Sequence, residues 1–123
     1  MPSGAGARRK GHDWEREVAR RCRETFGVDA HRGAQSRQGS DAPDVTGVPG
    51  YHIECKVGAR PPFEQALRQA QADAAGAVAV AVVKPDRRAP VVLMDFEDWL
   101  KMAGLAMETE MANKWLDGAD DDR

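Results

Sequence analysis

Apolar residues recur at helical spacing near the start of the chain. Trp14, Val18 and Cys22 stand at positions i, i+4 and i+8 within residues 12–25, which is the pattern of a helix with one buried face. Residues 1–9, which precede this segment, are small, polar and basic, so we expect a disordered arm there.

The period changes to two in residues 51–57, where every second side chain is hydrophobic. His52, Glu54 and Lys56 occupy the alternate positions and therefore share the other face of a predicted strand. A shorter strand is expected at 43–46. The Val-Pro-Gly sequence between the two segments predicts a turn that brings them side by side.

The rest of the chain adds three strands and two helices. The apolar run at 77–83 is typical of a strand buried on both faces, and Asp95 is a natural N-cap for a helix that ends near residue 101. The other predicted elements are strands at 28–32 and 91–94, a helix at 63–75, a loop at 33–42 and a single helical turn at 111–116. This order predicts an α/β protein with a mixed central sheet flanked by helices.

Composition narrows the class of protein. A chain of 123 residues with 41% hydrophobic and 31% charged residues fits one globular domain. It has no apolar run of the roughly 20 residues that cross a bilayer, and no apolar stretch near its start resembles a signal peptide, so we expect it in the cytoplasm. Its two cysteines are expected to be buried thiols. The three histidines lack zinc-ligand spacing, so any metal is expected to be held by oxygen.

Charge is unevenly distributed along the chain. The net charge is only −2, but residues 1–40 carry nine Lys and Arg against five Asp and Glu, whereas residues 108–123 carry two against six. A basic front and an acidic end are compatible with a face that binds a polyanion and a solvated terminus. Ordinary surface charge explains the same distribution equally well.

One group of polar residues points to hydrolytic chemistry. Pairing the strands across the turn would bring Asp44 close to Glu54, with Lys56 beside them. Two adjacent carboxylates repel each other unless a cation lies between them, and Mg²⁺ prefers such oxygen ligands. Lys56 would orient or deprotonate a water or stabilise charge on a phosphate, and the backbone carbonyl of Cys55 would add a ligand. Alternatively, Glu54 and Lys56 form the exposed face of an edge strand, and Asp44 is an ordinary turn residue.

These residues resemble the signature of a known superfamily. Pro43-Asp44 followed by Glu54-Cys55-Lys56 is similar to the motif of PD-(D/E)XK nucleases. Lys10-Gly11, three residues and then Glu15-Arg16-Glu17 resemble the opening of archaeal-type Holliday junction resolvases. The likeness covers about residues 10–85 and implies a restriction-endonuclease-like core with the order helix, three strands, helix, strand.

The resemblance also implies roles for individual residues. Asp44 and Glu54 would bind the metal directly, Lys56 would be the catalytic lysine, and Glu15 would complete the metal site, through water or directly. The alternative for Glu15 is a charge that merely favours a helix N-terminus. The residues implied in DNA binding are Arg8, Arg9, Lys10, Arg32, Ser36, Arg37 and Ser40, although Arg37 would serve equally as a solvated loop charge.

The expected function is therefore hydrolysis of DNA phosphodiester bonds with Mg²⁺ or Mn²⁺, at branched junctions and as a homodimer whose two-fold symmetry matches a four-way junction. The rivals are another DNA endonuclease on the same core, in repair, restriction or packaging, and a non-catalytic DNA-binding protein. We expect a basic arm at 1–9, a nuclease domain at 10–104 and an extension at 105–123 with a disordered acidic end. The excess of arginine over lysine suggests a bacterial or phage genome.

Overall fold

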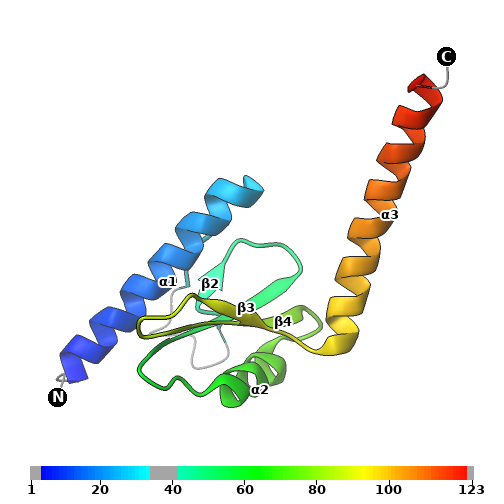
Figure 1. Ribbon diagram of the computed structural model, residues 1–123. Coiled ribbons are helices and arrows are strands. Elements are labelled where there is room, and N and C mark those ends of the chain that lie inside the picture. The colour runs from blue at the N-terminus through cyan, green and yellow to red at the C-terminus, as the bar shows by residue number, and fades with distance from the viewer. Residues whose placement is uncertain (1–3, 34–41, 122–123) are drawn as a thin grey trace.

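The computed structural model describes residues 4–33 and 42–121. Three helices and five strands are present in this part of the chain (Figure 1). In chain order they are α1 (Gly4–Phe26), β1 (His31–Arg32), β2 (Val45–Thr46), β3 (Tyr51–Gly58), α2 (Phe63–Asp73), β4 (Val78–Pro85), β5 (Val91–Leu93) and α3 (Phe96–Asp121).

The strands form one mixed sheet in the order β1-β2-β3-β4-β5. β3 and β4 run parallel from the pair Tyr51 and Val78 to the pair Gly58 and Pro85, and the remaining neighbours are antiparallel. The predicted α/β fold with a mixed sheet is confirmed. β3 is the central strand, so Glu54 and Lys56 do not belong to an edge strand.

Two apolar layers hold the helices against opposite faces of the sheet. On one face, Trp14 and Val18 of α1 pack near Ile53 and Cys55, and Trp14 Nε1 also donates to the carbonyl of Val82 at 3.2 Å. On the other face, small side chains of α2 meet small side chains of β4, which lets helix and sheet approach closely; they are Ala66, Ala70, Ala79 and Ala81. The apolar run of β4 therefore contributes to both layers, as its sequence predicted.

Both terminal helices extend further than the sequence indicated. α1 begins at Gly4, so residues 4–9 are helical and not a disordered arm. The alanines and arginines of this segment are strong helix formers, and the ion pair between Lys10 and Asp86 at 2.6 Å ties it to the end of β4. α3 runs without a break to Asp121, past the end predicted near residue 101 and through the region expected to be disordered.

Cys22 and Cys55 are free thiols, as predicted, but only Cys55 is buried, and Cys22 is partly exposed on α1. In the part of the chain that the structure describes, no helix is long and apolar enough to cross a membrane. The predicted strand at 28–32 is reduced to His31–Arg32, and the predicted glycine-rich loop lies mostly outside the described residues.

Candidate active site

Asp44 is held in place by its backbone and its side chain. Its amide donates to the carbonyl of Ile53 at 2.9 Å, and its carbonyl accepts from the amide of Gly33 at 2.8 Å. Its Oδ2 accepts from the amide of Cys55 at 2.8 Å. A side chain at position 33 would lie 2.2 Å from the carbonyl oxygen of Pro43, so only glycine allows this approach. Asp44 is therefore fixed beside the central strand.

Glu54 lies at the middle of β3, and its residue surface is only 2% exposed. Its Oε1 is 3.2 Å from His52 Nε2, and its carboxyl group shares a hydrogen bond with Asp44. Burial and the nearby Asp44 charge raise the pKa of Glu54 to about 8. Without a cation, this carboxyl group therefore tends to retain its proton.

Glu15 approaches the same region from α1. It is buried, and its Oε1 accepts from Arg32 Nε at 2.8 Å. Burial and the Asp44 charge raise the pKa of Glu15, while the hydrogen bond and charge of Arg32 oppose that rise. Glu15 is therefore a buried acid that faces the site, which the helix-terminus alternative does not explain.

Lys56 follows Glu54 by two residues on the same strand, so both side chains leave the same face of the sheet. It is partly buried, and its charge acts to lower the pKa of Glu54 without overcoming the effect of burial. Cys55 lies between them with its side chain in the α1 layer. Burial raises the pKa of the Cys55 thiol, which keeps it from acting as a thiolate ligand.

These acids fit a hard divalent cation. Glu54 and Glu15 each have a raised pKa, and Asp44 contributes to both shifts. Such a cluster is strained by like charge unless protons or a cation neutralise it. Buried carboxylate oxygens are the ligands that Mg²⁺ and Mn²⁺ prefer. The residues present are thus suited to a metal held by oxygen.

The sequence profile described as "Archaeal holliday junction resolvase (hjc)" matches residues 6–104. The chain belongs to this family. The family lies within the PD-(D/E)XK nuclease superfamily, so the resemblance drawn from Pro43-Asp44 and Glu54-Cys55-Lys56 is confirmed. Membership implies an endonuclease that cleaves junctions.

A solved structure shows the same fold. It is the 1.6 Å structure of Hjc from Archaeoglobus fulgidus, described as a Holliday junction resolvase from an archaeal hyperthermophile. The TM-score is 0.51 at 24% sequence identity, and the match covers 68% of this chain and 76% of that chain. No curated protein sequence matches this chain significantly.

His52 and Asp73 lie at the site, although the sequence analysis did not predict either as a metal ligand. His52, Glu54 and Asp73 form a group whose potential ligand atoms all lie within 4.8 Å of one another. The alternation of β3 placed His52 on the face of Glu54 and could have signalled its role. Asp73 ends α2, and only the packing of that helix on the sheet brings it near. No local pattern in the sequence reports that contact.

The residues predicted to bind DNA fall into three groups. Arg8 and Arg9 are exposed on the first turns of α1. Lys10 is bonded to Asp86, and Arg32 is bonded to Glu15, so both have protein partners in this structure. The residues that lie outside the described part of the chain are Ser36, Arg37 and Ser40.

Proposed function

We propose that this protein resolves four-way DNA junctions by metal-dependent hydrolysis of phosphodiester bonds, with Asp44, Glu54 and Lys56 at the centre of its site. The observation that carries the proposal is the buried Glu54 carboxyl group, hydrogen-bonded to Asp44 and next to Lys56 on the central strand. The family match over residues 6–104 supports the same activity.

Each residue has a distinct role in this proposal. Asp44 and Glu54 would hold Mg²⁺, or Mn²⁺ in its place, with the backbone carbonyl of Cys55 and with Glu15, directly or through water. When bound, the cation supplies positive charge that stabilises the developing charge on the phosphate. Lys56 orients the attacking water and donates a hydrogen bond to a phosphate oxygen in the transition state.

The surrounding residues position the acids. The amide of Cys55 fixes the Asp44 carboxylate, Arg32 fixes Glu15, and His52 fixes Glu54. Such positioning matters because small displacements of reacting groups cost large factors in rate. The proposed phosphate contacts remain Arg8, Arg9, Lys10 and Arg32, with Ser36, Arg37 and Ser40 from the loop.

The proposed active form is a homodimer, because two symmetric sites match the two strands that must be cut in a four-way junction. The proposed setting is the cytoplasm of a bacterial or phage-infected cell. Another DNA endonuclease activity on the same core is the second candidate, since a shared fold supports several substrates.

A cleavage assay tests the function and the site together. The wild-type chain should nick a four-way junction in the presence of Mg²⁺ and leave a linear duplex of the same sequence largely intact. Asp44→Asn and Glu54→Gln should each reduce the cleavage rate by about 10³-fold or more, which corresponds to about 4 kcal/mol of lost transition-state stabilisation. Junction binding should be largely retained, because neither change alters the shape of the side chain.

Matched controls remove exposed carboxylates elsewhere. Asp13→Asn and Glu64→Gln change side chains that are 65% and 83% exposed, and both variants should cleave like wild type. Equal cleavage of duplex and junction would favour the second candidate. Near-normal cleavage by purified Asp44→Asn or Glu54→Gln would remove the site assignment.

A further inference from the structure

α3 carries most of the exposed apolar surface. It leaves the sheet after β5 and projects away from the rest of the protein (Figure 1). Of the thirteen large hydrophobic side chains exposed in the described residues, nine lie on α3; they are Phe96, Trp99, Leu100, Met102, Leu105, Met107, Met111, Trp115 and Leu116. Neither apolar core layer in that part of the chain includes a residue of α3. Contiguous patches this apolar usually mark an interaction surface.

The apolar residues surround this helix instead of forming one stripe. Phe96, Leu100, Met107 and Met111 share one side at helical spacing. Trp99 and Met102 lie on another side and line a groove on the body of the protein. A helix that is apolar on more than one side is suited to a position between two surfaces. α3 therefore has a second side that its own chain leaves uncovered.

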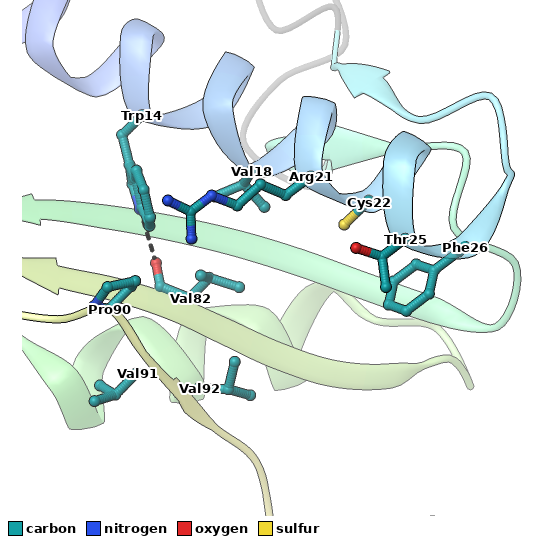
Figure 2. A pocket seen from close by; sticks show the side chains of 10 residues that line it. All are labelled: Trp14, Val18, Arg21, Cys22, Thr25, Phe26, Val82, Pro90, Val91 and Val92. Atoms are coloured by element: carbon teal, nitrogen blue, oxygen red, sulfur yellow. Dashed lines mark hydrogen bonds between the residues drawn. The ribbon is translucent and has the colours of Figure 1, made fainter.

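The same chain offers a complementary groove. It lies between α1 and the first turns of α3, with β3, β4 and β5 as its floor, and its volume is about 750 Å³. The lining is almost entirely apolar and includes Val18, Cys22 and Phe26 of α1. Figure 2 shows the adjoining hollow, where Val91 and Val92 of β5 lie below α1. This half of the sheet face has no helix over it in the described structure.

The net charge of α3 indicates which kind of partner its apolar surface binds. Residues 96–118 carry five Asp and Glu against two Lys and Arg, whereas residues 4–26 of α1 carry seven Lys and Arg against four Asp and Glu. An acidic helix is poorly suited to an anionic membrane or to DNA, since both attract basic helices. It is better suited to an apolar groove that a basic helix borders. In a second copy of this chain, α1 borders such a groove, and its Arg21 lines the adjoining hollow.

We propose that two copies of this chain exchange their α3 helices, so that the outer half of each α3 covers the apolar groove of the other copy. The two contacts are related by a two-fold axis, so the exchange closes on itself. The family match ends at residue 104, so the outer half of α3 belongs to this chain beyond the shared family region. The exchange specifies the interface of the proposed homodimer, but it does not depend on nuclease activity.

Sedimentation velocity on the full chain, without DNA or metal, tests the exchange. The wild-type chain should sediment as a dimer at micromolar concentration. Met107→Glu with Met111→Glu should shift it to monomer, because two charges would enter the apolar contact. The matched control is Thr109→Glu with Asn113→Glu, which adds the same charges at the same spacing on the opposite side of α3. The control should remain a dimer.

Labelling of Cys22 tests whether the groove is covered, independently of the oligomeric state measured by sedimentation. It lines the groove, whereas Cys55 is buried in the core. A thiol reagent should label Cys22 slowly in the wild-type dimer and at least several-fold faster in the Met107→Glu, Met111→Glu variant. Circular dichroism should show that this variant remains folded, so that faster labelling reflects an open groove.

Three outcomes would overturn the proposal. They are a monomeric wild-type chain, a variant with both methionines replaced that remains a dimer, and a lost dimer with no change in Cys22 labelling. A monomeric wild-type chain that binds neutral vesicles would assign α3 to a lipid surface. A monomeric wild-type chain would also count against the proposed homodimer, whereas the cleavage assay on Asp44 and Glu54 tests the site assignment separately.

Discussion

Arg32 holds one of the acidic residues of the candidate site in place. The family resemblance implies a phosphate contact for Arg32, but its Nε donates to Glu15 at 2.8 Å. A guanidinium holds a carboxylate more rigidly than an ammonium does, because its donors form a fixed planar fork. Arg32 therefore influences how Glu15 faces Asp44, in addition to any contact with DNA.

Replacing either partner should change the response to metal. Glu15→Gln should slow cleavage, but less than Asp44→Asn, and should raise the Mg²⁺ concentration needed for half-maximal rate. Arg32→Ala should change the same concentration, because it releases the Glu15 carboxylate. Cleavage rates across a Mg²⁺ titration measure both effects. A purely weaker junction affinity in Arg32→Ala, with an unchanged metal response, would show that Arg32 acts only on DNA.

Glu54 should make the metal-free protein less stable as pH rises. Its pKa is about 8 in the folded chain, above the ordinary value of 4.5 for a glutamic acid. Between these values the folded state retains a proton that the unfolded state has lost, so unfolding becomes more favourable with rising pH. The Tm measured in EDTA should therefore fall from about pH 5 to pH 8 through this group.

Glu54→Gln is the decisive comparison, since its amide cannot ionise. The part of the fall in Tm that is due to Glu54 should disappear in this variant, whereas Glu64→Gln, at an exposed position, should retain it. Added Mg²⁺ should raise the Tm of wild type most at pH 8. Parallel pH profiles for wild type and Glu54→Gln would show that this carboxyl group ionises as freely in the folded chain as in the unfolded one.

At the scale of elements, the first turns of α1 present basic side chains from a helix instead of a flexible arm. Arg8 and Arg9 are exposed there, whereas Lys10 is paired with Asp86. Replacing Arg8 and Arg9 with alanine should weaken junction binding and flatten the plot of log K against log salt by up to about 0.9 per lost phosphate contact.

Junction affinity at several salt concentrations measures this effect. Arg68→Ala serves as a control, because Arg68 is an exposed arginine on α2, which covers the opposite face of the sheet from α1. Lys10→Ala should flatten the plot less, since Lys10 must first leave Asp86. An unchanged slope in the Arg8, Arg9 variant would place the DNA on another surface.

The elements with a clear period could be predicted from sequence, and those without one could not. Residues 51–57 and 77–83 were identified closely because alternation and a continuous apolar run reflect their burial. α3 was identified only at its start, because its apolar residues occupy several sides and give no helical period. Its good helix formers, Ala, Leu, Met, Glu and Lys, carried the missing signal.

In the candidate site, a contact set by a local turn could be predicted, whereas contacts set by the packing of distant elements could not. Asp44 and Glu54 could be brought together from the turn between their strands, which is a local feature. Asp73 could not, since it approaches Glu54 only because α2 packs against the sheet. The partner of Arg32 also depends on a contact between α1 and β1 that no spacing in the sequence reports.

At the scale of the whole molecule, the central position of β3 governs how the protein can open. The amides of β3 lie between two neighbouring strands and two helical layers, so hydrogen exchange at Glu54, Cys55 and Lys56 should require global unfolding. Amides in the first turns of α1 should exchange by local fraying. Native-state exchange read by NMR measures both, and equal rates in the two segments would contradict this expectation. Because β3 opens only on global unfolding, the candidate site should survive partial melting of the chain ends. It should be lost only in the cooperative unfolding transition.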